Sequence, residues 1–295
     1  MRIAHLSDAH IGPLPRPRVH ELLGKRITGF TNWRRGRFRT HDMALLARIL
    51  DDIAAHAPDH VAMTGDIVNI GLASEFPPAR RFLERLGTPE QVSFVPGNHD
   101  AYVRQALLPM RRELGPWMCG DGDTAPAFPY VRKRGGVALI GLSSGVPTLP
   151  FLASGTLGRE QLSALETTLA ALGREGLCRV VLIHHPPYKA GAKPSRGLTD
   201  AADFERVIAD AGAEIVLHGH NHRTMLAEIP TRTGRPAVIL GAPSASAISG
   251  TLDHRAGYHL LTIAPDGERS AITLVTRGYD AAADDIVTLD ERPLR

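Results

Sequence analysis

Short apolar runs alternate with stretches of helical periodicity along most of the chain. The apolar runs predict strands over 2–6, 60–63, 91–95, 137–142, 179–183 and 214–217. Apolar residues at helical spacing predict helices between them, over 40–56 with Thr40 as N-cap, 74–86, 159–172 and 199–211. This alternation is typical of βαβ units, in which crossover helices join parallel strands. The pattern therefore predicts an α/β fold.

The last part of the chain has a different pattern. Apolar runs at 236–240, 258–263 and 271–276 are short, and no helical pattern separates them. We expect antiparallel strands that complete a second sheet. Because no repeat, low-complexity tract or linker divides the sequence, residues 1–295 are expected to form a single domain.

Composition narrows the class of protein. With 43% hydrophobic and 22% charged residues, the chain has the make-up of a globular protein, which excludes disorder and a coiled coil. No run approaches the ~18 to 20 apolar residues of a membrane span, and polar residues by position 7 leave no room for a signal peptide. Only Cys119 and Cys178 are present. We expect a cytoplasmic protein with unpaired thiols, and a bridge between these two cysteines stays the alternative.

Polar motifs follow five of the predicted strands or turns. They are SDAH at 7–10, TGDIVN at 64–69, PGNHD at 96–100, IHHPP at 183–187 and HGHNH at 218–222. In open α/β sheets, side chains just beyond the carboxyl ends of strands meet in one crevice. Seven of these residues are potential metal ligands: Asp8, His10, Asp66, Asn98, His184, His220 and His222.

The ligand types indicate the chemistry. Carboxylate, imidazole and amide oxygen suit divalent Mn, Fe or Zn, and neither cysteine lies in a motif. The members of the pairs Asp8/His10 and His220/His222 are two residues apart, so in extended backbone each pair projects to one side. Two ions about 3.5 to 4 Å apart can share a carboxylate and a hydroxide and clamp phosphoryl oxygens. That arrangement needs about seven ligands, so the sequence predicts a two-metal hydrolase.

Some residues near the motifs are ambiguous. His184 directly follows the strand over 179–183 and is the preferred ligand, whereas His185 would point the opposite way and stays the alternative. His5 and His218 are candidates for hydrogen bonds to ligands or for packing. His41 is interpreted as a surface or core residue. Turns with positive φ are one explanation for Gly65, Gly97 and Gly219.

The set D-x-H, G-D, G-N-H-D, a histidine after an apolar strand and G-H-x-H resembles the calcineurin-like metallophosphoesterase superfamily over roughly residues 3–245. TGDIVNIG and VPGNHD are most similar to the bacterial branch of cyclic-nucleotide and glycerophosphodiester phosphodiesterases. The resemblance implies the metallo-dependent phosphatase fold, a four-layer α/β/β/α sandwich with two mixed β-sheets.

The resemblance also implies roles for individual residues. The first metal would be bound by Asp8, His10 and His222, the second by Asn98, His184 and His220, and Asp66 would bridge them. A bridging hydroxide would attack phosphorus in line. His99 would lie against the phosphate, stabilising the transition state or protonating the leaving oxygen, and Asp100 would position its imidazole.

A basic segment over 13–39 is longer than the corresponding stretch usually is in the family, so the resemblance implies nothing about its role. It contains eight Lys or Arg residues and one acid, Glu21. Apolar residues recur at nearly helical spacing: Val19, Leu22, Leu23, Ile27, Phe30 and Trp33. Gly24 and Gly29 oppose a continuous helix by about 1 kcal/mol each. One interpretation is an insertion that packs its aromatic residues on the domain, and another is an amphipathic helix at a membrane surface.

The functional interpretation of this segment is a lid. Its arginines, Arg34 and Arg35 among them, would grip an anionic substrate together with Asn98 and His99, and its apolar side would face a lipid tail. Nucleic acid is not expected, since the aromatic residues are too few and too bunched for a stacking platform. A monomer is expected, because no long insertion between the last strands offers a dimer-forming cap.

Three functional hypotheses follow. The first is a phosphodiesterase for a small substrate such as a cyclic nucleotide or a glycerophosphodiester. The second keeps the metal chemistry but hydrolyses a lipid-linked pyrophosphate or phosphodiester, such as a nucleotide-linked acylated sugar, with residues 13–39 at the membrane. The third is a metal-binding scaffold without catalysis.

Overall fold

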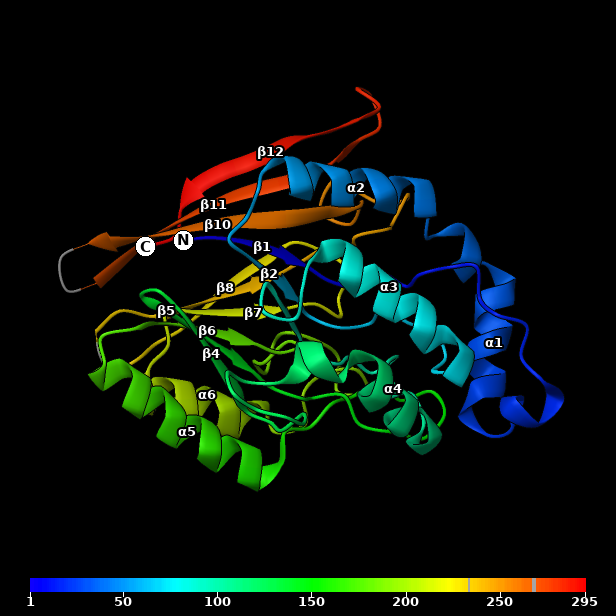
Figure 1. Ribbon diagram of the computed structural model, residues 1–295, viewed down its shortest axis with the longest axis horizontal. Coiled ribbons are helices and arrows are strands. Elements are labelled where there is room, and N and C mark those ends of the chain that lie inside the picture. Colours follow the sequence, from blue (N-terminus) through cyan, green and yellow to red (C-terminus); the bar gives the residue numbers. More distant parts are fainter. Residues whose placement is uncertain (233, 267–268) are drawn as a thin grey trace.

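The computed structural model describes residues 1–232, 234–266 and 269–295. Two six-stranded sheets face each other, and helices cover their outer sides (Figure 1). Both sheets mix parallel and antiparallel pairs. The predicted four-layer α/β/β/α sandwich is confirmed.

The first sheet combines the two ends of the chain. It contains, in spatial order, β12 (Asp285–Pro293), β11 (Arg269–Asp280), β10 (Gly257–Asp266), β1 (Arg2–Leu6), β2 (His60–Met63) and β3 (Val92–Phe94). β1, β2 and β3 are parallel, and β10 pairs with β1 in the antiparallel direction, with Ile3 opposite Leu261. The prediction that runs 258–263 and 271–276 complete the second sheet is wrong. The chain returns to the free edge of β1, a long-range pairing that local periodicity does not encode.

The second sheet contains β4 (Tyr130–Arg134), β5 (Val137–Gly141), β6 (Cys178–Leu182), β7 (Ile215–His218), β9 (Ala237–Gly241) and β8 (Met225–Ile229). Its four central strands are parallel and its two edge strands are antiparallel. The run over 236–240 is therefore a parallel strand, not an antiparallel one. The edge strands β4 and β8 were not predicted, because exposed residues interrupt their apolar pattern.

Four helices occupy the predicted crossovers: α2 (Met43–Ala55), α3 (Phe76–Leu86), α5 (Gly158–Arg174) and α6 (Ala201–Ala211). The helix α1 (Lys25–Arg35) lies in the basic segment, and α4 (Leu107–Leu114) was not predicted. Short 3-10 turns lie at η1 (Val19–Leu22), η2 (Arg37–Arg39), η3 (Ala73–Glu75), η4 (Arg104–Ala106) and η5 (Gly115–Met118). The helix α2 begins later than predicted, because Asp42 rather than Thr40 is its N-cap. The Asp42 carboxylate accepts hydrogen bonds from the N–H groups of Ala44 and Leu45.

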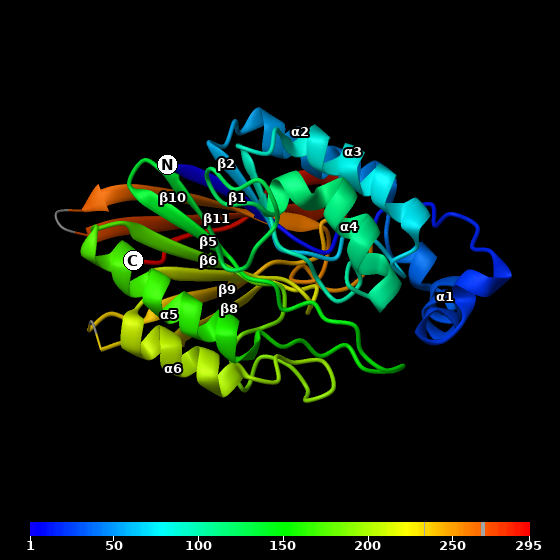
Figure 2. The same cartoon turned by 60° about the horizontal axis from the view of Figure 1, so that its bottom comes forward.

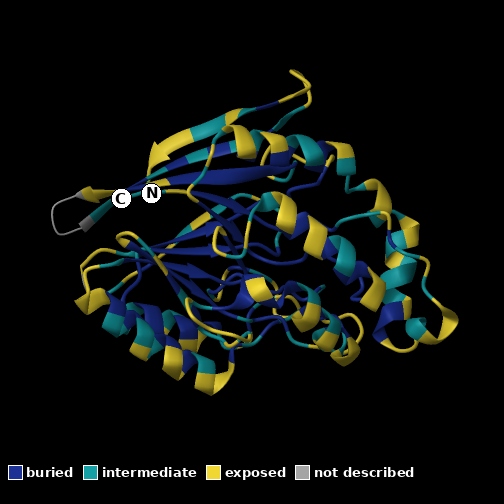
Figure 3. Ribbon diagram, in the orientation of Figure 1, coloured by how far each residue is buried: buried dark blue, intermediate teal, exposed yellow. Residues whose placement is uncertain are grey.

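Alternate residues of the central strands face opposite sides of their sheet. On β6, Val180 and Leu182 belong to the core that joins the two sheets, whereas Val181 belongs to the core under α5 and α6. The central strands are consequently buried, whereas the outer faces of the helices and much of the edge strand β12 are exposed (Figure 3). This packing gives the loops beyond the strand ends a rigid support.

The basic segment over 13–39 lies at the end of the molecule toward which β1 runs (Figure 1, Figure 2). Gly24, with φ 75°, separates η1 from α1. Gly29 instead lies inside α1, where a Cβ atom would overlap the Tyr102 hydroxyl. Leu22, Phe30 and Trp33 pack on a small cluster of buried residues around Tyr102. The segment therefore docks its aromatic residues on the sandwich, as one interpretation expected.

None of the helices in the described residues is long and apolar enough to cross a membrane. Cys119 and Cys178 are buried free thiols, as expected. Burial raises the pKa of Cys178 to about 11, so this thiol stays protonated and unreactive near neutral pH.

The N-cap of α2 gives a stability test. Replacing Asp42 by Ala removes two hydrogen bonds to main-chain N–H groups, so the free energy of unfolding should fall by about 1 kcal/mol. Thr40→Ala is the matched control, because Thr40 lies outside the cap and its change should cost less. Urea unfolding of both variants measures the difference. A larger cost for Thr40→Ala would contradict the assignment of the cap.

Candidate metal centre

The loops after β1, β2, β3, β6 and β7 bring the seven predicted ligands together beneath one cavity of about 440 Å³. Asp66, Asn98, His220 and His222 line this cavity. Asp8, His10 and His184 lie beneath it and are fully or almost fully buried. The strand-end motifs therefore converge as predicted.

The backbone of these loops is strained. Five of the seven ligands have left-handed backbone conformations: Asp8 (φ 54°), His10 (φ 40°), Asp66 (φ 57°), His220 (φ 71°) and His222 (φ 52°). Such conformations cost about 1–3 kcal/mol each in residues other than glycine and concentrate at functional sites. The prediction that the two D-x-H and H-x-H pairs use extended backbone is wrong. The pairs converge through tight turns instead.

The ligand atoms form two clusters that share Asp66. Asp8, His10 and Asp66 form one, and Asp66, His184 and His220 form the other, with the atoms of each cluster within 4.8 Å of one another. His222 Nε2 lies 3.1 Å from Asp8 Oδ1, and His184 Nε2 lies 3.2 Å from Asp66 Oδ2. Ligand atoms about 2.0–2.2 Å from one ion are about 3 Å apart. These separations fit metal coordination.

Hydrogen bonds fix which imidazole atoms can bind an ion. His10 Nδ1 lies 3.1 Å from the Val68 carbonyl and His184 Nδ1 lies 2.7 Å from the Thr64 carbonyl. A carbonyl only accepts, so each Nδ1 carries the proton and each Nε2 presents its lone pair to the cluster. Asp8 Oδ1 and Asn98 Oδ1 are buried without a hydrogen-bond partner among the described residues. The residues therefore fit a pair of divalent cations.

Hydrogen bonding also favours His184 over His185 as the metal ligand. Both ring nitrogens of His185 have partners outside the clusters, Ser144 Oγ at 2.8 Å and the Ala153 carbonyl at 3.1 Å. His184 directs Nε2 at Asp66. The geometry favours His184 as the ligand.

Asp100 supports the ligand loops. Its buried carboxylate accepts hydrogen bonds from four main-chain N–H groups, those of Gly97, Asp66, Ile67 and Val68. The ring of His99 is held instead by the Asn69 carbonyl, which accepts from Nδ1. Asp100 was predicted to position the His99 imidazole, and its observed contacts give it a different role, because they fix the turn that carries Asp66.

Gly97 and Gly219 lack a positive φ, but each lies so close to a neighbouring side chain that a Cβ atom would not fit. A Cβ atom on Gly97 would overlap Asp66 Oδ1, and one on Gly219 would overlap Ser7 Oγ. Only Gly65 among the three motif glycines has the expected positive φ, at 100°. The close contacts explain why these positions tolerate no side chain.

His99 faces the cavity through one nitrogen. Its ring stacks on Tyr102 with 5.4 Å between centroids, and Nδ1 is bonded to Asn69. Nε2 accepts a hydrogen bond of 3.0 Å from Arg37. Burial and the Arg37 charge lower the pKa of His99 to about 3, so the imidazole is neutral.

The basic segment reaches the site through residues that were not predicted. Arg37 donates to His99 Nε2 and, at 2.9 Å, to His10 Nε2, where an ion bound to that nitrogen would replace the hydrogen bond. Arg37 has no carboxylate within ion-pair distance in the described part of the chain. Lys25 also lines the cavity, and its Nζ donates to Thr148 Oγ1 at 2.5 Å and to the Leu152 carbonyl at 3.0 Å. Burial lowers the pKa of Lys25 to about 8.

Arg34 and Arg35, the predicted substrate contacts, lie elsewhere. Both are exposed on α1 and neither lines the cavity. The Arg34 guanidinium lies 5.9 Å from the centroid of the Phe30 ring. Local sequence does not separate Arg37 from its neighbours, although Gly36 marks the end of α1 just before it.

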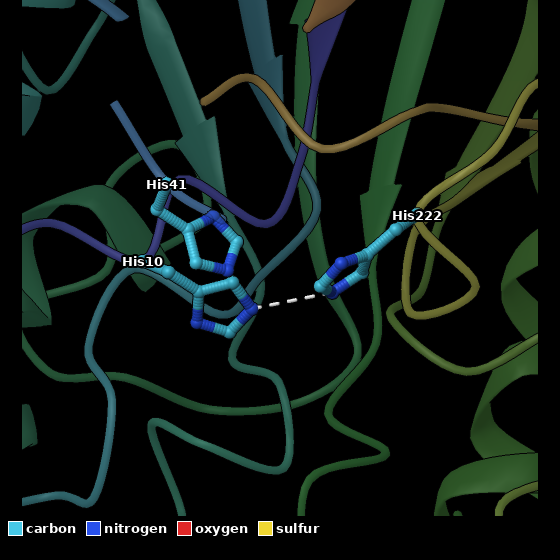
Figure 4. A group of neighbouring side chains, drawn as sticks. All are labelled: His10, His41 and His222. Atoms are coloured by element: carbon cyan, nitrogen blue, oxygen red, sulfur yellow. Dashed lines mark hydrogen bonds between the residues drawn. The ribbon is translucent and has the colours of Figure 1, made fainter. Parts of the chain in front are cut away.

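His41 was also missed. It forms a third cluster with His10 and His222, and the three rings lie close together in Figure 4. Its interpretation as a surface or core residue arose because it lies outside every motif.

The fold and the two candidate metal-binding clusters that share one carboxylate are typical of a two-metal phosphoesterase. The family model of the calcineurin-like phosphoesterases matches residues 1–224, and the chain belongs to that family. It is accordingly a metallophosphoesterase, and the non-catalytic scaffold is set aside.

Individual relatives agree with the predicted branch. A Synechococcus protein named "Probable cyclic nucleotide phosphodiesterase" is 26% identical over 225 residues, covering 75% of this chain and 78% of the relative. Glycerophosphodiester phosphodiesterase GpdQ of Enterobacter lignolyticus is 29% identical over 191 residues, which cover 65% of this chain but only 59% of GpdQ. The solved structure of a dimetal phosphatase from Danio rerio matches 98% of both chains with a TM-score of 0.59 and 14% identity, a likeness of fold.

The metal content of two variants tests whether His184 or His185 is the ligand. His184→Gln should lose most of the second ion, because Nε2 is removed from the cluster with Asp66 and His220. The matched variant His185→Gln should keep two ions per chain, since both of its nitrogens are engaged elsewhere. Elemental analysis after loading with Zn²⁺ measures both. Loss of an ion from His185→Gln alone would reverse the assignment.

Proposed function

We propose that the protein hydrolyses phosphodiesters with two divalent ions, Mn, Fe or Zn. The observation that carries this proposal is the pair of clusters that share Asp66 at the base of a cavity lined by cationic side chains. A pair of ions bound there supplies the nucleophile at neutral pH and neutralises charge on the phosphoryl oxygens. Both curated relatives bear phosphodiesterase names, which supports a diester substrate.

The two clusters support the ligand assignment that the family resemblance implies. Asp8, His10 and His222 would hold the first ion, Asn98, His184 and His220 would hold the second, and Asp66, which belongs to both clusters, would be shared. The lone pairs of His10 and His184 are aimed by the carbonyls behind them. Asp100 holds the Asp66 turn in its left-handed conformation through main-chain hydrogen bonds.

Arg37 takes the role that the sequence assigned to Arg34 and Arg35. Its two Nη groups point at His99 and His10, the side of the cavity where the substrate phosphate must lie. A guanidinium donates two parallel hydrogen bonds to a phosphate, and a buried cation without a carboxylate partner is stabilised by such an anion. Asn98 lines the same cavity and completes the phosphate contacts, and His99 Nε2, which accepts from Arg37, holds the guanidinium on that side.

Arg37 can be tested against a neighbour on the same turn. With a chromogenic small diester such as bis(p-nitrophenyl) phosphate, Arg37→Ala should lower kcat/KM by about 100-fold, as loss of one group that stabilises the transition state does. Arg37→Lys should recover only part of this loss, because an ammonium lacks the planar pair of donors.

Arg39→Ala is the control, since Arg39 is exposed on η2 with its guanidinium over Phe38. Metal content is measured in each variant. Equal activity of Arg37→Ala and Arg39→Ala with both ions bound would remove Arg37 from the phosphate site.

A lipid-linked substrate is the second candidate, and one observation favours it. Large apolar side chains are exposed on the basic segment and beside the cavity: Val19 is 87% exposed, Leu23 75% and Phe151 83%. Phe151 also lines the cavity. Together with exposed Arg34 and Arg35 of the same segment, Val19 and Leu23 suit a peripheral contact with an anionic membrane surface on the cytoplasmic side.

This candidate has its own test. The double variant Val19→Ser/Leu23→Ser should bind phosphatidylglycerol vesicles at least about tenfold more weakly, because two exposed apolar side chains can no longer enter the bilayer interface. Hydrolysis of the small diester should be unchanged, since neither residue lines the cavity.

Leu108→Ser, at a position 76% exposed on α4, is the matched control for vesicle binding. If the double variant and Leu108→Ser bind vesicles as the wild type does, the lipid-linked substrate loses its support and the small diester remains.

A further inference from the structure

The backbone of His41 is fixed by the loop between β9 and β10, far along the chain. His41 pairs with Ala247 in an isolated antiparallel bridge, and the N–H of Asp42 donates to the Ser246 carbonyl at 2.9 Å. The next residue on the other side, Thr40, accepts from the N–H of Ile248 at 2.9 Å. With α2 beginning directly after Asp42, the position of the His41 side chain is determined on both sides.

A chain of hydrogen bonds determines where the proton of His41 lies. Ser246 Oγ donates its only proton to the Ala9 carbonyl at 2.7 Å. The same oxygen lies 2.8 Å from His41 Nδ1, so it must accept there and Nδ1 must carry the proton. In the neutral imidazole, Nε2 is then left with its lone pair.

That lone pair faces the first metal cluster. The centroid of the His41 ring lies 4.7 Å from that of His10 and 5.9 Å from that of His222. Ligand atoms of the three residues lie within 4.8 Å of one another, and Figure 4 shows the rings grouped in this way. Nε2 of His41 has no hydrogen-bond partner among residues 1–232, 234–266 and 269–295.

His185 shows what a purely structural histidine in this fold looks like. It is fully buried, and both of its ring nitrogens are hydrogen-bonded, one to Ser144 Oγ and the other to the Ala153 carbonyl. His41 instead has one nitrogen held and the other presented, as His10 and His184 do. The same arrangement of a carbonyl or hydroxyl behind Nδ1 is what orients metal-binding imidazoles in general.

We propose that His41 is an additional ligand of the first metal ion, beside Asp8, His10 and His222. The proposal rests on the two-metal site of the proposed function. It gives the first position three imidazoles against two, His184 and His220, at the second. Nitrogen-rich sites prefer Zn²⁺, Co²⁺ or Fe²⁺ to Mg²⁺ or Mn²⁺, so the two positions should differ in affinity and in metal preference.

Titration with Co²⁺ tests this proposal without an activity assay. The full chain is stripped with a chelator and titrated while the visible absorption of bound Co²⁺ and its competition with a chromophoric chelator are followed. The wild type should bind two ions with different affinities. His41→Gln should weaken the tighter of them by at least about tenfold and alter its absorption band, since loss of a ligand costs no less than loss of a group behind one.

Two further variants complete the experiment. His20→Gln is the control, because His20 is exposed on η1 and should titrate as the wild type does. Ser246→Ala keeps the imidazole but removes the acceptor behind Nδ1, so it should weaken the same ion by a smaller factor. It also provides the test if His41→Gln does not fold.

The outcomes are distinct. Co²⁺ affinities and spectra of His41→Gln and Ser246→Ala that match the wild type would overturn the assignment of His41 while leaving the two-metal enzyme intact. A wild type that binds fewer than two Co²⁺ ions would overturn the proposed function itself, before any variant is compared. Selective loss of one ion in His41→Gln supports the proposal.

Discussion

The carboxylate of Asp100 is the interaction on which the rest of the site depends. It is fully buried and accepts four main-chain hydrogen bonds, one from the loop after β3 and three from the loop after β2. These bonds hold Asp66 in its left-handed turn, and Asp66 Oδ1 in turn accepts from the N–H of His99. Two loops from neighbouring parallel strands thus become one rigid unit, and both metal clusters are built around the single carboxylate that it presents.

Some cationic side chains of the basic segment form hydrogen bonds with the sandwich, whereas others are exposed to solvent. Arg26 donates to the carbonyls of Ile70 and Gly71, and Lys25 reaches across to the loop that carries Thr148 and Leu152. α1 is therefore tied to two loops that lie far apart in the sequence, and Arg37 of the following turn lies against His99. The same arrangement leaves Val19 and Leu23 exposed to solvent, so one insertion carries both inward-facing cations and exposed apolar side chains.

Sequence predicted the parts of the fold and site that local spacing encodes. Strand β2 has the predicted bounds, and the motif ligands converge because each follows a strand that is buried in the same sandwich. His41 and Arg37 could not be found in this way, because their positions depend on contacts with residues far along the chain, such as Ser246. The addition of β10 to β1 and the role of Asp100 were missed for the same reason, since each is a long-range hydrogen-bonding choice among alternatives that look equal locally.

The left-handed ligands carry a consequence for evolution and engineering. Five strained residues cost about 1–3 kcal/mol each. The free energy of unfolding of a folded protein is only about 5–15 kcal/mol, so the strain is large on this scale. Holding the ligand loops in these conformations therefore lowers the free energy of unfolding of the enzyme. In a descendant that no longer needs catalysis, replacing Asp8 or His222 by glycine would relieve backbone strain and increase stability. Loss of metal ligands in such a lineage would therefore be favoured by stability alone.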